Sequence, residues 1–112
     1  REPIEPAGGA PGAALARAFR RWVNCRMELP AERAMKCLAM LSGEARVVRK
    51  QGGKEFALFS RVRFLTEPAL AAKPVNINVR GLRLEQVVDM IAAQLNARIA
   101  KDDDKVKFTP RP

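Results

Sequence analysis

The side chains with the most capacity for chemistry in this chain are two cysteines, Cys25 and Cys37, and three adjacent aspartates, Asp102 to Asp104. Histidine is absent, which removes the residue most often used as a general base and as a metal ligand. Two cysteines alone are too few for a zinc site. The aspartates resemble part of a cation site, but no further ligand stands at the spacing of a calcium loop. We therefore expect a solvated turn there, no metal, no cofactor and no catalytic residue, so that the protein is not an enzyme.

The cysteines leave two interpretations open. Isolated cysteines are commonly small buried thiols, and the sequence favours this role. In an oxidising compartment, however, Cys25 and Cys37 can pair in a disulfide, and this pairing is our candidate bridge.

Positive charge is the other chemical signature of the chain. It carries 21 Lys and Arg against 12 Asp and Glu, a formal net charge of +9. Such an excess suggests an acidic partner, a nucleic acid or an anionic membrane face, or simple solvation of a small domain. Basic residues are densest within 44–65, where arginines also alternate with phenylalanines, as on a nucleic-acid platform or on any half-solvated strand. The candidate partner-binding residues in this segment are Arg46, Arg49, Lys50, Arg61 and Arg63.

The composition predicts one domain with a leading linker. Residues 1–13 are rich in proline and glycine without a periodic pattern, which predicts a flexible linker. Residues 14–112 suffice for a single domain, with the core of the fold at 25–108. No apolar run approaches the roughly 18 to 20 residues of a membrane span, so we expect no transmembrane segment. Residue 1 is arginine rather than methionine, which is typical of a processed chain or of a piece cut from a longer protein; a signal or lipoprotein segment could therefore have been removed.

The first part of the domain predicts a strand followed by a helix. Apolar residues alternate over 25–29, which indicates a strand of period two. Pro30 ends this strand and suits the first turn of a helix over 31–43, which Gly43 is expected to close. Before the strand, residues 14–24 predict a short helix that presents Trp22 on its apolar side.

A later segment repeats this pattern more regularly. Alternation over 75–80 predicts a strand, Gly81 breaks it, and 84–97 form an amphipathic helix. The two strand–helix segments supply the predicted structural core: Met35, Leu38, Leu41, Val75, Ile77, Val79, Leu84, Val88, Ile91 and Leu95.

Two hairpins are predicted as well. Gly52 and Gly53 supply the positive φ angles of a turn inside 44–65, and a closing hairpin turns at 102–104. The helices match in register, Glu32 with Glu85 and Leu38 with Ile91. We therefore expect an α+β fold of two strand–helix–strand half-repeats, giving a small mixed sheet shared by two helices, plus the inserted β-hairpin. Open strand edges should remain.

Two stretches carry a resemblance to a known family. The segment EPALAAKPVNINVRGLRLEQVVDMIAAQLNARIAKDDDKVKF resembles the second half of the secretin and TonB-receptor short N-terminal (STN) domain. The segment MELPAERAMKCLAMLSG is similar to its first half. The resemblance covers residues 25–108 and departs from the family at RVVRKQGGKEFAL, the inserted basic hairpin.

The resemblance implies a non-enzymatic docking or adaptor domain in the periplasm of a Gram-negative bacterium. Its partners would be protein components of an envelope-spanning secretion, pilus or conjugation assembly, and copies of it could form a ring. The expected mode of contact is strand addition to an open sheet edge. One alternative is a signalling domain of a TonB-dependent receptor or its regulator. An alternative of another class is a small basic RNA-binding or ribosome-associated protein, although no aromatic RNA-binding strand is evident, so nucleic acid is not the expected partner.

Overall fold

The computed structural model describes residues 11–49 and 51–112. The predicted linker therefore lies almost wholly outside the described residues, and Lys50 lies outside them too. The elements in chain order are α1 (Ala13–Phe19), β1 (Trp22–Pro30), α2 (Ala31–Ser42), β2 (Glu44–Arg49), the 3-10 turn η1 (Gln51–Gly53), β3 (Glu55–Ser60), β4 (Arg63–Thr66), α3 (Pro68–Ala71), β5 (Pro74–Arg83), α4 (Leu84–Leu95), β6 (Ala97–Asp102) and β7 (Lys105–Pro110).

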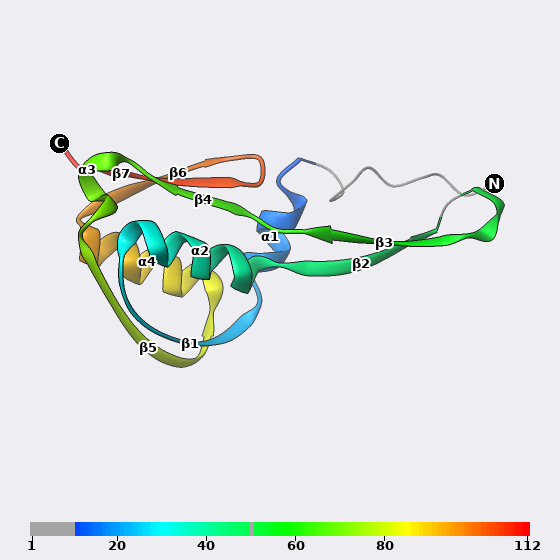
Figure 1. Cartoon of the computed structure of the whole chain (residues 1–112), viewed down its shortest axis with the longest axis horizontal. Helices are drawn as coiled ribbons and strands as arrows, with labels where there is room; N and C mark the ends of the chain where they lie inside the picture. Colours follow the sequence, from blue (N-terminus) through cyan, green and yellow to red (C-terminus); the bar gives the residue numbers. More distant parts are fainter. Residues whose placement is uncertain (1–10, 50) are drawn as a thin grey trace.

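Helices α2 and α4 form a middle layer between a two-stranded and a three-stranded sheet (Figure 1). On one side β1 and β5 pair antiparallel. On the other side β7 lies between β4 and β6, parallel to β4 and antiparallel to β6. Helix α2 contacts β1 and β4, and helix α4 contacts β5 and β6. The predicted α+β fold, with two strand–helix–strand half-repeats, a small mixed sheet and an inserted hairpin, is confirmed.

The arrangement differs from the prediction in one respect, because the two helices do not share a single sheet. The strands that precede the helices pair with each other, whereas β4, which follows the inserted hairpin, and β6, which follows α4, belong to the three-stranded sheet. Helix α4 contacts strands of both sheets, β5 and β6. It does so through one broad apolar face, because its buried residues fall at the spacing of a single amphipathic stripe. These residues are Leu84, Val87, Val88, Ile91, Ala92 and Leu95.

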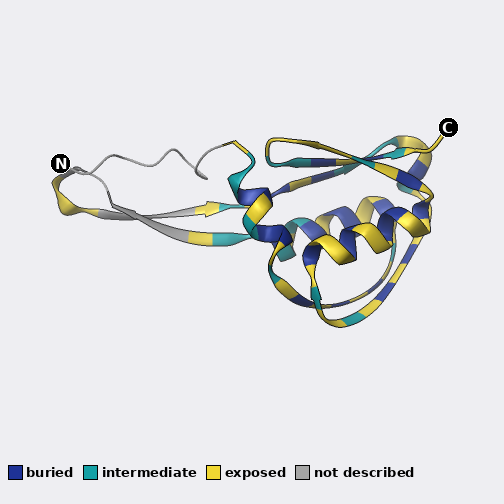
Figure 2. Cartoon of the chain, turned by 180° about the vertical axis from the view of Figure 1, so that it is seen from behind, coloured by how far each residue is buried: buried dark blue, intermediate teal, exposed yellow. Residues whose placement is uncertain are grey.

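The core joins the helices to both sheets. Every predicted core residue is buried except Leu41 and Val79, which are partly buried against the core. Along β1 and β5 buried and exposed residues alternate, as expected for strands with one face on the helices (Figure 2). The sequence did not reveal the contribution of the three-stranded sheet, whose buried residues are Phe64, Ala97, Val106 and Phe108.

The first helix is shorter than predicted. Helix α1 ends at Phe19, and Trp22 begins strand β1 with its side chain 63% exposed. In β1, Trp22 stands opposite Arg83, whose guanidinium lies 5.0 Å from the centre of the indole ring. The expectation that Trp22 belongs to an apolar helical face is therefore wrong, because pairing with β5 takes the chain out of the helix first.

Helix α2 ends at Gly43 as predicted, but the glycine does not adopt the conformation that usually closes a helix. The residue has φ −65° instead of the left-handed conformation. Arg21 supplies the missing interaction, since its Nη1 donates to the carbonyl oxygens of Leu41 at 2.7 Å and Gly43 at 2.9 Å. A Cβ at position 43 would lie 2.8 Å from the ring of Phe59, so a larger residue there would require this exposed side chain to move.

The inserted hairpin forms an arm that projects from the layered body (Figure 1). Strands β2 and β3 pair antiparallel, and Gly52 and Gly53 adopt the predicted positive φ, 84° and 80°. The strand predicted beyond the turn is divided in two, since β3 ends at Ser60 and β4 starts at Arg63. Between them Val62 is buried, and its N–H donates to Oγ of Ser42 at 2.9 Å. This contact marks the point where the chain leaves the arm and enters the body.

Candidate functional site

The three aspartates form the predicted turn of the closing hairpin. Asp102 pairs with Lys105 across β6 and β7, and Asp103 has φ 51°. Asp104 accepts a hydrogen bond at 2.9 Å from the backbone N–H of Leu15, so this carboxylate ties helix α1 to the hairpin. Among the described residues, no three or more Cys, Asp or Glu side chains are grouped to hold a metal ion.

The two cysteines are free thiols that line one groove. Cys25 is buried on β1 and Cys37 is partly exposed on α2. Burial, with a smaller effect of the neighbouring charge on Cys37, raises the pKa of the Cys25 thiol. The structure places the two thiols on facing elements, and the candidate disulfide stays a prediction.

The predicted partner-binding residues follow the arm and its base. Arg61 and Arg63 are exposed at the end of β3 and the start of β4. The Arg61 guanidinium lies 5.0 Å from the ring centre of Phe59, which is itself exposed. Arg46 and Arg49 belong to β2, but their side chains lie outside the described part of the structure, as does Lys50. The described side chains therefore place two of the five candidates at the surface where the arm meets the body.

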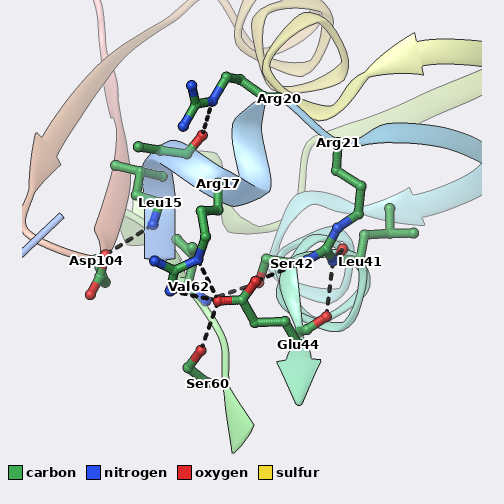
Figure 3. A network of polar contacts seen from close by, with 12 residues as sticks. Leu15, Arg17, Arg20, Arg21, Leu41, Ser42, Glu44, Ser60, Val62 and Asp104 are labelled. Carbon is green, nitrogen blue, oxygen red and sulfur yellow. Dashed lines mark hydrogen bonds and ion pairs between the residues drawn. The ribbon is translucent and has the colours of Figure 1, made fainter. Parts of the chain in front are cut away.

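A polar network fixes the base of this arm (Figure 3). The Glu44 side chain, only 17% exposed, accepts a hydrogen bond from Nε of Arg17 at 2.7 Å and pairs with Arg21 at 3.5 Å. Ser60 donates to the same carboxylate at 3.4 Å. The network joins α1, β2 and β3, so it orients the arm relative to the two sheets. Sequence reasoning missed Glu44 because a single acidic residue after a helix has no pattern.

A helix side chain closes the outer edge of β5 at Asn76. The N–H of Asn76 donates to Oε1 of Gln94 at 2.8 Å, and Nε2 of Gln94 donates to the carbonyl of Asn76 at 2.7 Å. Gln94 thus makes the two hydrogen bonds that a neighbouring strand would make. Sequence reasoning missed this role, and the only available signal was a polar residue beside the apolar row of the helix.

The outer edge of β1 is open by contrast. No side chain or backbone group in the described ranges 11–49 and 51–112 hydrogen-bonds to the edge of residues 24–27 that faces away from β5. A groove of about 390 Å³ runs beside it, lined by residues 24–27 and by Cys37, Met40 and Leu41 of α2. Met40 is 72% exposed. The groove therefore offers unpaired backbone groups next to the exposed Met40 and the partly buried Cys37 and Leu41.

A second strand edge, that of β6, also borders a hollow. This hollow, about 520 Å³, lies against α4 and is lined by Asp89, Ala92, Ala93, Ala97, Arg98, Ile99 and Arg111. Its small residues leave little apolar area, and Arg111 already donates from Nε to the carbonyl of Ala97 at 3.3 Å. The β1 groove is the better candidate for a docking site because its edge is unpaired and its helix side chains are large and apolar.

Comparison with protein-family models and with curated proteins finds no match to this chain. In the described part of the chain, no helix has the length and apolar character needed to cross a membrane. The geometry of the open β1 edge therefore carries the functional argument.

Proposed function

We propose that this protein is a non-enzymatic docking domain of a bacterial envelope assembly, acting in the periplasm of a Gram-negative bacterium. The observation that carries the proposal is the open edge of β1 beside the apolar groove of α2. An extended segment of a partner can pair with such an edge through its backbone, and its side chains can enter the groove. The resemblance of residues 25–108 to the STN domain of secretins supports the setting.

The basic arm has a separate role in this proposal. Arg61 and Arg63 stand at its base, and the network around Glu44 holds that base against α1. Exposed charge mainly accelerates association and selects partners, whereas affinity comes from strand pairing and apolar contacts. The acidic surface of another envelope protein, or of a neighbouring copy in a ring, is the partner we propose for the arm.

A photo-crosslinking amino acid at Met40 tests the docking role in cells that carry the native assembly. We expect capture of an exported envelope protein, together with slower amide exchange at 24–27 when that protein is bound. The matched control is the same amino acid at Met90, which is exposed on α4. Capture of a TonB-dependent receptor or its regulator would favour the signalling alternative. Capture of RNA, or of the same proteins from both positions, would contradict a docking groove at β1.

A further inference from the structure

We infer that a hollow on the outer face of the β1–β5 ribbon binds a carboxylate from an acidic segment of the partner. The hollow measures about 430 Å³ and is lined by Asn24, Cys25, Arg26, Asn78, Val79 and Arg80. That the carboxylate belongs to a docking partner rests on the docking role proposed above. That the hollow binds a carboxylate at all follows from the residues that line it.

The strand register brings two arginines to this face. Arg26 stands directly opposite Asn78, and the next pair along the ribbon is Cys25 with Val79. Arg26, Asn24, Asn78 and Arg80 are exposed, while Cys25 points inward and is buried. Because neighbouring side chains on one face of a sheet lie within reach of one another, the guanidinium groups flank the hollow from two strands.

A β-bulge shapes the hollow. The pairing passes from Val23 with Leu82 to Cys25 with Val79, so β5 holds one more residue than β1 in this interval. Gly81 takes φ 65°, and bulges of this kind redirect the neighbouring side chain. The predicted break at Gly81 is therefore a bulge inside a continuous strand, and it sets the position of Arg80.

The bulge also determines which end of the Asn24 amide is the hydrogen-bond acceptor. The N–H of Gly81 donates to Oδ1 of Asn24 at 2.9 Å. Since the oxygen of this amide is the acceptor, its NH₂ group is directed elsewhere and can donate. Asn24, Arg26 and Arg80 all line the hollow, so the groups that border it include the donors that an anion requires.

The two arginines have no anionic partner in the described part of the protein. Neither Arg26 nor Arg80 takes part in an ion pair there, whereas Arg17 and Arg21 both pair with Glu44. The nearest acidic residue on the same face of β1 is Glu28, two positions beyond Arg26, and it does not line the hollow. The site therefore carries uncompensated positive charge and complements an acidic ligand.

The surroundings favour an acidic polypeptide over a nucleic acid. Nucleic-acid platforms stack successive bases on several aromatic rings, but the outward residues of this ribbon include one aromatic ring, Trp22, and Arg83 already lies 5.0 Å from its centre. The hollow adjoins the open edge at 24–27, where a strand could be added. Every second side chain of that strand would face outward, so an acidic residue at one of those positions would lie beside Arg26.

The direct test uses a short blocked peptide in which Glu alternates with Thr, followed by the fluorescence of Trp22, the only tryptophan. The double variant Arg26→Gln/Arg80→Gln removes both guanidinium groups. The control Arg33→Gln/Lys36→Gln removes the same charge from exposed positions of α2. We expect affinity to fall more than about ten-fold in the first and less than about two-fold in the second, since hydrogen bonds to charged groups contribute about 1.5 to 3 kcal/mol.

Three outcomes would overturn the inference: no saturable binding by the wild-type protein, equal losses in both double variants, or tighter binding of a short oligothymidylate through the same arginines. The crosslinking experiment at Met40 separates this inference from the docking role. If an envelope partner is captured at Met40 but the peptide binds equally well without Arg26 and Arg80, the carboxylate site is contradicted and the docking role stands. If peptide binding requires both arginines but no envelope partner is captured, the docking role is contradicted and the carboxylate site stands.

Discussion

The two half-repeats bury their helices alike but leave different strand edges. In the second half, Gln94 of α4 makes two hydrogen bonds to Asn76 and closes the edge of β5 at that residue. The register that matches Leu38 with Ile91 places Leu41 at the position of Gln94. Leu41 lines the groove beside β1 and cannot hydrogen-bond to the strand. One amide side chain thus closes the edge of β5 at Asn76, whereas the matching residue of the first half leaves the edge of β1 unpaired.

The halves also differ after their helices. Helix α4 passes directly into β6 through Asn96, which has φ 51°. Helix α2 is followed by Gly43 and by the arm of β2 and β3 before the chain reaches β4. The open edge and the arm therefore belong to the same half of the molecule. The first half carries the arm and the open edge beside an apolar groove, whereas the second half contributes Asn78 and Arg80 to the hollow on the outer face of the ribbon.

The largest predicted effect tests the claim that the two helices are equivalent in the core. Leu38 and Ile91 occupy matching positions, and both are fully buried. Leu38→Ala and Ile91→Ala should each lower the free energy of unfolding by about 2 to 5 kcal/mol, through lost burial and a residual cavity. Urea denaturation measures both. A loss below about half a kcal/mol for either variant would contradict the matched burial.

The core elements were predictable because their signals are local. Apolar residues at a period of two over 75–80, and at helical spacing from Leu84 onward, depend only on neighbouring positions. The division of the strands between two sheets was not predictable in this way, since pairing between β1 and β5 joins remote residues. The candidate site could not be predicted from the sequence for the same reason. Gln94 and Glu44 act through partners remote in sequence, and polar residues on exposed surfaces follow no period.

A smaller loss of stability should follow when the anchor of the arm is removed. Glu44→Gln keeps the shape of the side chain but loses the charge that faces Arg17 and Arg21. We expect the free energy of unfolding to fall by about 1.5 to 3 kcal/mol, the range for hydrogen bonds to charged groups. The control Glu28→Gln changes an exposed carboxylate and should leave unfolding nearly unchanged. Equal effects of the two variants would mean that the network does not hold the arm.

A test of the closed edge replaces Gln94 by the residue that its counterpart carries. Gln94→Leu removes both hydrogen bonds to Asn76, so the free energy of unfolding should fall by about 1 kcal/mol. The amide hydrogen of Asn76 should also exchange faster, because it loses its acceptor. Gln94→Glu keeps an acceptor for that amide and should retain most of the protection. Unchanged exchange at Asn76 in the leucine variant would show that β5 is closed by other means.

The smallest effect concerns the thiols of the open groove and changes a rate without changing the fold. Because burial raises the pKa of the Cys25 thiol, less of it is thiolate at a given pH, and the thiolate is the reactive form. Cys37 is partly exposed on α2, so iodoacetamide should modify Cys37 first. Modification of Cys25 should accelerate as the pH rises through its raised pKa. Peptide mass spectrometry over time measures both rates.

The same measurement distinguishes the two interpretations of this cysteine pair. Two free thiols both become alkylated, in the order Cys37 and then Cys25, whereas a disulfide would block both until a reductant is added. Equal rates for the two thiols would contradict the burial of Cys25 beneath the groove.

The alkylation rate of Cys37 also reports whether a bound partner occupies the groove. A strand added along residues 24–27 would cover the groove that both cysteines line, so a bound partner should slow the alkylation of Cys37, and a partner that docks elsewhere should leave its rate unchanged.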